Sequence, residues 1–312
     1  MKRWPLVLCA ALACKRAAPP SQPTLFGGER GLDHVGIVVN DLAEAQRTFH
    51  DRLGFGAMEA GKVANGIENV NYYFEDSTYL ETLRGGSFAG RPEGAAFAAL
   101  SVASAAQTAA FLAARGIRTG APIAGSIKTA RASDDHWQTM FFEGSPLPRD
   151  PVFFIEYAQP ARRDTLDKLR SAVQAGRVYK HPNGALGVKA VWLAVPDLAA
   201  AVKSFEAAGL AAGAEFAERR LGAAGCAIDA GEGKILLVAP AAADGAVAEF
   251  LSRRGGPGLL GVSIEVSLLG LAQRFAVGAT GKPALPAPGA LGQSVFIEPA
   301  VAHGAWLEFV QR

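Results

Sequence analysis

Three side chains in stretches with strand patterns have the chemical types that metal binding or proton transfer requires: His34, Glu81 and Glu156. One imidazole and two carboxylates suit a hard or borderline divalent ion such as Mn²⁺, Fe²⁺, Ni²⁺ or Zn²⁺. Three protein ligands would leave coordination positions for water or for two neighbouring substrate oxygens. Burying two carboxylates without a cation or hydrogen-bond donors is costly. The alternative is that no metal binds, with His34 an ordinary buried histidine and the glutamates paired with arginines or exposed to solvent.

The elements that would position these side chains belong to a segment that recurs four times. It reads LDHVGIVVNDLAEAQRTFHDRLGF at 32–55, and further copies lie at 95–117, 188–210 and 258–278. Each copy has an apolar strand pattern, a helix-capping residue and an amphipathic helix that stops at a glycine. The caps and glycines are Asp41 and Gly54, Ser104 and Gly116, Asp197 and Gly209, and Ser267 and Gly278. Because strand patterns follow each helix, every copy predicts a βαβββ module.

The spacing of the four copies predicts two domains in an α+β fold. A longer interval, with a helix pattern of its own, separates the second copy from the third, so the modules are expected to pair as first with second and third with fourth. The predicted divisions are a signal segment at 1–14, a flexible tether at 15–30, a first domain at 31–159, a linker at 160–185 and a second domain at 186–312.

Composition excludes two classes of protein. The 312 residues carry 31 basic and 29 acidic side chains spread along the chain, which is not the clustered positive charge of a nucleic-acid-binding protein. Of the three cysteines, Cys9 and Cys14 lie in the N-terminal segment and Cys226 alone lies in the predicted domains, so a disulfide framework is excluded.

The N-terminus reads as an export signal. Residues 1–14, MKRWPLVLCAALAC, combine a basic start with an apolar stretch that is too short to span a bilayer. The ending Ala11-Leu12-Ala13-Cys14 resembles a bacterial lipobox, which predicts lipidation of Cys14. The protein would then be anchored to a membrane surface of the bacterial cell envelope, facing the periplasm or the exterior. An ordinary cleaved signal is the alternative.

The four modules together resemble the vicinal oxygen chelate superfamily, and more narrowly its glyoxalase-like branch. The resemblance is carried by LDHVGIVVNDLAEAQRTFHDRLGF with TYLETL, by FFIEYAQ, and by HPNGALGVKAVWLAVPDLAAAV. It implies two glyoxalase/bleomycin-resistance/dioxygenase-like domains, each built from paired modules whose strands curl into a cup. In metal-using members the cup holds a divalent ion, with one ligand from the first strand and one from the last strand of each module.

Laid in register, the copies select one cup. In the later copies the counterparts of His34 are Phe97, Ala190 and Leu260. Those of Glu81 are Glu156, Leu237 and Glu308. The first domain therefore offers His34, Glu81 and Glu156 as metal ligands, whereas the second offers Glu308 alone. We expect Glu81 or Glu156 to move a proton, and Asn71, Tyr73, Phe97 and Trp137 to line the substrate site.

Two functions follow from this assignment. One is a metal-dependent lyase or isomerase that acts on a small substrate with neighbouring oxygens. The other is a metal-free binding protein that sequesters a small hydrophobic or aromatic ligand at the cell envelope. The histidine and glutamates favour the first function, and the phenylalanine at position 97 favours the second.

Overall fold

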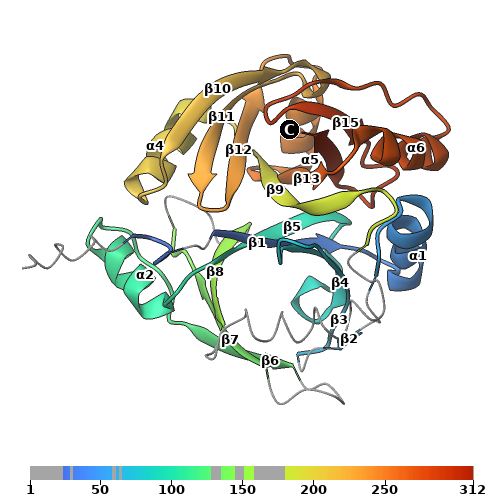
Figure 1. Ribbon diagram of the computed structural model, residues 1–312. Helices are drawn as coiled ribbons and strands as arrows, with labels where there is room; N and C mark the ends of the chain where they lie inside the picture. Colours follow the sequence, from blue (N-terminus) through green and yellow to red (C-terminus); the bar gives the residue numbers. More distant parts are fainter. Residues whose placement is uncertain are drawn as a thin grey trace, which may run out of the picture.

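The computed structural model describes residues 24–28, 31–57, 61–62, 65–127, 135–144, 151–157 and 180–311, and within them the chain forms two curled eight-stranded sheets. The strand orders are β2-β3-β4-β1-β5-β8-β7-β6 and β10-β11-β12-β9-β13-β16-β15-β14. The two orders have the same connectivity, as two pairs of βαβββ modules require. The predicted α+β class and the pairing of the modules are confirmed (Figure 1).

The first sheet and its helical segments have the following bounds: β1 Gly31–Val38, α1 Leu42–Gln46, the π-helical turn η1 Arg47–Arg52, β2 Gly61–Lys62, β3 Ile67–Tyr73, β4 Tyr79–Gly85, η2 Gly86–Phe88, β5 Gly94–Ser101, α2 Ala105–Ala113, β6 Ile123–Ile127, β7 Asp135–Phe141 and β8 Val152–Tyr157. Those of the second are β9 Ala185–Ala194, α4 Leu198–Ala207, β10 Ala212–Glu218, η3 Arg219–Leu221, β11 Ala223–Ala230, β12 Gly233–Pro240, α5 Ala246–Arg254, β13 Gly258–Val266, α6 Leu269–Thr280, β14 Ala287–Pro288, β15 Gln293–Ile297 and β16 Trp306–Gln311.

The predicted helix signals hold in three modules and shift in the fourth. Asp41 accepts hydrogen bonds from the backbone at the start of α1, and Ser104 and Asp197 do the same for α2 and α4. In the fourth module the helix starts one residue late, with Leu268 at the cap position, and continues to a left-handed Gly281. The prediction of a Ser267 cap and a Gly278 stop was therefore wrong, because Gly278 lies within α6.

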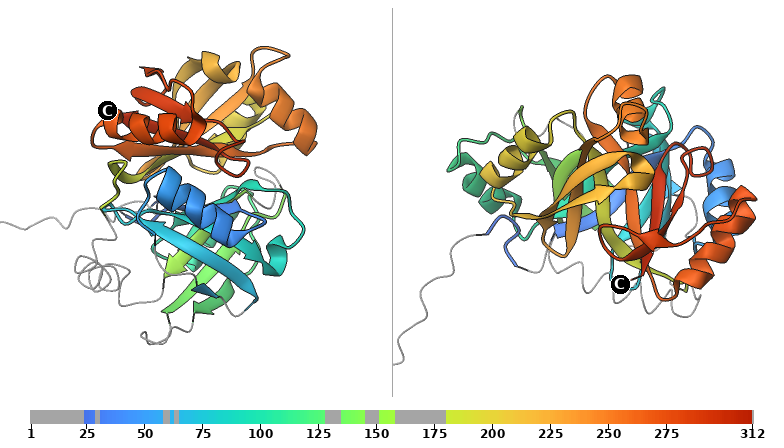
Figure 2. Two further views of the ribbon diagram at one scale, coloured as in Figure 1. Left: turned by 90° about the vertical axis from the view of Figure 1, so that its right-hand side faces the viewer. Right: turned by 90° about the horizontal axis from the view of Figure 1, so that it is seen from above.

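The two domains lie back to back. The outward face of each central strand, with Val35 and Ile37 on β1 and Val191 on β9, contributes to one hydrophobic core that both domains share. The two sheets therefore curve away from each other (Figures 1 and 2). We call the inner face of the first sheet, with His34, the first cup, and that of the second sheet, with Glu308, the second cup.

Close helix contacts across the domains repeat with pseudo-symmetry. A side chain at Gly54 would meet the ring of Phe275 on α6, and one at Gly209 would meet the ring of Phe111 on α2. Each glycine thus serves twice, as the left-handed helix end and as the flat surface on which an aromatic ring of the other domain packs.

The HPNG segment before β9 fastens the domain junction by hydrogen bonds. His181 accepts at Nδ1 from the Gly56 backbone N–H and donates from Nε2 to the Tyr73 carbonyl, both at 2.9 Å. Asn183 donates to the Leu53 carbonyl at 2.8 Å. Burial lowers the pKa of His181 to about 4, so its ring is neutral at pH 7.

No helix in the described ranges is long and apolar enough to cross a bilayer.

Candidate functional site

The first cup has a polar wall built from the first module. On β3 and β4, Asn71 lies opposite Glu81 and Tyr73 lies opposite Tyr79, while β1 places Gly36 beside Glu81. Because side chains alternate along a strand, these residues share the inner face with His34. Asn71 donates to the Tyr73 hydroxyl at 3.1 Å.

His34 is held on several sides. The side chain is buried, with 4% exposed, and it stacks on Tyr79 with ring centroids 4.3 Å apart. The rings of Phe97 and Phe153 meet it edge-on at 5.7 and 6.2 Å. Nδ1 of His34 lies 2.8 Å from Oδ1 of Asp33, and since a carboxylate only accepts, Nδ1 carries the hydrogen. Nε2 is then the unprotonated nitrogen, and none of the described residues bonds to it.

Asp33 is a site residue that the sequence interpretation missed. It is fully buried, and its Oδ1 also accepts from the Tyr157 hydroxyl at 3.0 Å. A register shift in the β1–β5 pairing between Leu32 and His34 marks a bulge at Asp33, which explains how neighbouring residues meet on one side of a strand. Strict alternation would have placed the carboxylate on the opposite face, so only its adjacency to His34 was visible in the sequence.

Glu81 is the second ionisable group of the polar wall. Its Oε1 accepts from the Asn69 amide at 2.7 Å, and the side chain is half-buried. Loss of hydration raises the pKa of the Glu81 carboxyl above its ordinary value, whereas the Asn69 hydrogen bond, and His34 when its ring is protonated, act in the opposite direction. The carboxyl therefore holds a proton more readily than an exposed glutamate does.

Glu156 lies on the other face of the sheet. Its Oε2 accepts from the Ala105 N–H at 2.7 Å, at the first turn of α2. The pairing shows why: β1 sets Gly36 beside Glu81, and the equivalent pair of the second module sets Ala99 beside Phe153. The counterpart of Glu81 is thus Phe153, and the alignment of Glu156 with Glu81 was wrong by three residues, an odd number that reverses the side chain's direction.

The second module gives the first cup an aromatic wall. Phe97 packs on this wall, and Trp137 lies against Gly125 of the neighbouring strand. Their apolar neighbours on this face are Phe88, Phe141, Phe153 and Ile155. The cup is therefore two-sided, with proton-bearing groups on one wall and rings on the other.

The donors of the first cup do not fit a complete metal site. The four positions that would supply ligands hold His34, Glu81, Phe97 and Phe153, so only two of them can coordinate. Among the described residues, no group of three or more histidine, cysteine or acidic side chains is arranged to hold an ion. Catalytic zinc sites use three protein ligands, one more than these positions supply.

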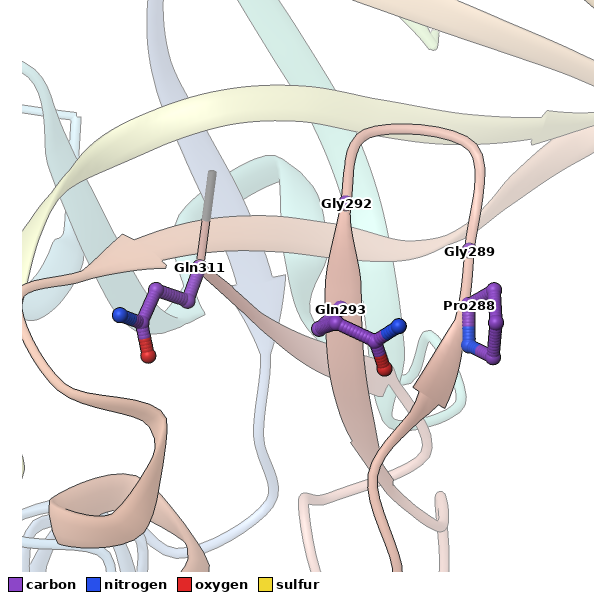
Figure 3. A pocket seen from close by; sticks show the side chains of 5 residues that line it. All are labelled: Pro288, Gly289, Gly292, Gln293 and Gln311. Atoms are coloured by element: carbon purple, nitrogen blue, oxygen red, sulfur yellow. The ribbon is translucent and has the colours of Figure 1, made fainter.

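Two hollows lie away from the first cup. One, of about 540 Å³, is lined by Pro288, Gly289, Gly292, Gln293 and Gln311 at the edge of the second domain (Figure 3). The other, of about 480 Å³, lies between the domains beside Thr48, Glu93 and His303. Neither contains a residue predicted for the site.

Cys14 lies outside the described residues, and its lipidation stays a prediction.

Comparisons with known proteins agree with the fold. A hypothetical protein from Staphylococcus aureus aligns with a TM-score of 0.58 and 13% identity, over 90% of this chain and 98% of its own. A mutant 4-hydroxymandelate synthase from Streptomyces coelicolor aligns with a TM-score of 0.56 and 15% identity, over 91% and 93%. At such identities the likeness shows the fold alone, which is that of the vicinal oxygen chelate proteins, and it confirms the two glyoxalase-like domains. No curated protein matches the sequence.

The family assignment rests on the sequence itself. The family described as the Glyoxalase-like domain matches residues 32–210, which cover more than half of the chain. That range contains the whole polar wall of the first cup and extends through the first strand and helix of the second domain. The chain therefore belongs to the Glyoxalase-like domain family.

Proposed function

We propose that the first cup binds a small carbonyl compound with a flat apolar part, and that His34 transfers a proton at its polar end. The observation that carries this proposal is the buried Asp33–His34 hydrogen bond beside an aromatic wall. Isomerases and lyases that remove a proton next to a carbonyl need such a group. A ligand that reaches both walls would place its rings on Phe97 and Phe153 and its oxygens toward His34.

Asp33 supports the proposed role of His34 in two ways. By accepting from Nδ1 it fixes the tautomer in which Nε2 has a free lone pair, and it stabilises the imidazolium that forms when Nε2 takes a proton. The Tyr157 hydroxyl supplies a second hydrogen bond to the same carboxylate oxygen and helps to hold it in place. The ring of Tyr79 restricts rotation of the imidazole.

Glu81 provides a second proton-transfer group on the same wall. Its raised pKa brings the carboxyl closer to the working range of a general acid, and Asn69 fixes its orientation. His34 would remove a proton and Glu81 would return one, which is the division of roles that an isomerisation requires. The electron pair stays on the substrate as an enolate, and protonation at the neighbouring atom completes the step.

A binding protein without catalysis is the second candidate, and the aromatic wall favours it. Phe97 and Phe153 stand where metal-using relatives would have ligands, and rings are what a sequestering site for an aromatic ligand would use. Both candidates predict binding in the same cup, so the first test is of binding. We expect aromatic carbonyl compounds from a screening panel to raise the melting temperature of the wild-type chain.

Matched variants test the location of binding. F153A should abolish the rise in melting temperature, whereas F111A, which alters a ring on the outer helix α2, should retain it. A panel that stabilises F153A as strongly as the wild type would place the ligand elsewhere and sink the proposal.

We also infer that the chain is lipidated at Cys14 and works at the cell envelope. The basic start, the apolar stretch and the lipobox-like ending support this location. The intact protein should partition into the detergent phase on Triton X-114 separation, and C14A should not. Recovery of both forms in the aqueous phase would contradict the anchor.

A further inference from the structure

The second cup contains a buried polar cluster around Glu308. This carboxylate is fully buried and accepts from the hydroxyls of Ser263 and Ser294, both at 2.6 Å. Ser263 in turn accepts from the indole N–H of Trp192 at 2.8 Å. Both serines are also fully buried, so the cluster has little access to water. A buried carboxylate needs a nearby positive charge or a full set of donors.

Arg220, on the short η3 turn, supplies the positive charge. It makes two hydrogen bonds to the Glu218 carboxylate, both 2.8 Å long, and its Nη2 lies 3.8 Å from Oε1 of Glu308. It also donates to the carbonyl and the hydroxyl of Ser294, each at 3.0 Å. The guanidinium stacks over Phe296 at 4.4 Å. Glu218 is 2% exposed, so one cation serves two buried carboxylates.

Glu308 occupies a strand position at which metal-using relatives would have a ligand. β13 and β16 set Ser263 beside Glu308 in the same way that β5 and β8 set Ala99 beside Phe153. The three other equivalent positions hold Ala190, Leu236 and Gly261, none of which can coordinate an ion. The strand pairing thus corrects the sequence alignment, which had Leu237 and Leu260, by one residue in each of these two modules. The donor set therefore does not fit a metal site, yet its one remaining acid is retained and buried.

The backbone closes over this cluster. A side chain at Gly289 would lie 2.8 Å from Oε1 of Glu308 and 2.9 Å from Nη2 of Arg220. Gly289 also lines the hollow of about 540 Å³, together with Pro288, Gly292, Gln293 and Gln311 (Figure 3).

We propose that Arg220 is an internal cation that replaces a divalent metal in the second cup. The guanidinium neutralises Glu218 and Glu308, ties η3 to β15, and makes the second domain a closed structural partner of the first. This role is independent of the chemistry in the first cup. It predicts that removing the guanidinium leaves two buried carboxylates facing one vacated space, which a divalent ion can then enter.

The test is a thermal-denaturation series with Mn²⁺ or a chelator. Without metal, R220A should melt about 10 °C below the wild type, as expected when one partner of a buried ion pair is removed. Addition of Mn²⁺ should recover much of that loss in R220A and leave the wild type unchanged. The control R219A, which removes the exposed neighbouring arginine, should match the wild type in both conditions.

The double variant R220A/E308Q completes the test. Removing one of the two unpaired charges should raise the melting temperature above that of R220A and abolish the response to Mn²⁺. If R220A does not fold, R220A/E308Q should still fold. An R220A variant as stable as the wild type, a wild type that responds to Mn²⁺ as R220A does, or a double variant no more stable than R220A would each overturn the proposal.

Discussion

The hydroxyl of Tyr157 and the imidazole of His34 bond to the same oxygen of Asp33, at 3.0 and 2.8 Å. Tyr157 ends the last strand of the second module, and His34 lies on the first strand of the first. The site is therefore assembled across the module boundary, and each module depends on the other for its geometry. Hydrogen bonds to an ionised oxygen are the stronger kind, so this shared acceptor is a rigid point of the cup.

D33N should reverse the tautomer of His34. An asparagine at this position can present its amide N–H to Nδ1, which would move the ring hydrogen to Nε2 and remove the free lone pair from the cup. Nitrogen-15 NMR of the imidazole should show the Nδ1–H form in the wild type and loss of that form in D33N. The nearby D51N is a suitable control, because Asp51 pairs with the exposed His50 at 2.7 Å. An unchanged His34 tautomer in D33N would contradict the assignment.

Y157F should weaken the support of Asp33 without removing it. Loss of one hydrogen bond to a buried carboxylate should lower the free energy of unfolding by about 1–3 kcal/mol. The His34 tautomer should persist, because the bond from Nδ1 remains. Denaturant unfolding and the same NMR spectrum measure the two effects separately. A loss of the Nδ1–H form in Y157F would show that the hydroxyl, and not Asp33 alone, sets the tautomer.

Metal content should depend on Phe97 and Phe153. Elemental analysis of the wild-type chain is expected to find less than about a tenth of an equivalent of any divalent ion, since two donors fall short of a catalytic site. F97H/F153E completes four ligand positions and should bind about one equivalent. E156Q in that background should bind the same amount, because Glu156 faces α2. Stoichiometric metal in the wild type would refute the metal-free account of the cup.

E156Q should change only the stability of the fold and not the binding of ligands in the first cup. The Glu156 carboxylate accepts from the first turn of α2, where negative charge is favoured by the helix dipole. The substitution should lower the free energy of unfolding by roughly 0.5–1 kcal/mol and leave ligand binding in the first cup unaltered. If E156Q weakened ligand binding as much as substitutions of His34 do, Glu156 would be a residue of the site, which contradicts this assignment.

His181 should make stability fall in mild acid. The unfolded chain protonates this histidine near its ordinary pKa of 6.5, whereas the folded chain does so at about 4. The stability that comes from the neutral ring is thus fully present above pH 6.5 and is lost as the pH falls toward 4. Over that interval the contribution changes by about 1.4 kcal/mol per pH unit. In H181N the free energy of unfolding should be lower at pH 7 and should change less between pH 6.5 and 4; an unchanged slope would contradict this reading.

The sequence was sufficient for the fold because its signals are local and repeated. Asp41 and Gly54 mark the ends of a helical segment through their own backbone preferences, and the same signals recur in later modules. The choice of the first cup over the second rests on the sequence, since Ala190 cannot do the chemistry of His34, and it stays a prediction.

The details of the site depend on pairing between strands, which a single strand does not reveal. The bulge at Asp33 and the direction of Glu156 are both set by neighbouring strands. Glu156 was aligned with Glu81 by residue type, although the ladder pairs the modules through Phe153. Arg220 could not be linked to Glu308 because the two are far apart in the chain and meet through the curl of the sheet.

The most direct test of the central claim is solvent deuterium exchange at carbonyl compounds that bind the first cup. The wild-type chain in D₂O should exchange the hydrogen next to the carbonyl of a bound compound, as followed by proton NMR. H34Q should slow this exchange by at least about 100-fold. H50Q, which alters a histidine that is 53% exposed and bonded to its own neighbouring aspartate, should leave the rate unchanged. Exchange that persists in H34Q, or a wild type that binds these compounds but exchanges none of them, would contradict proton transfer by His34.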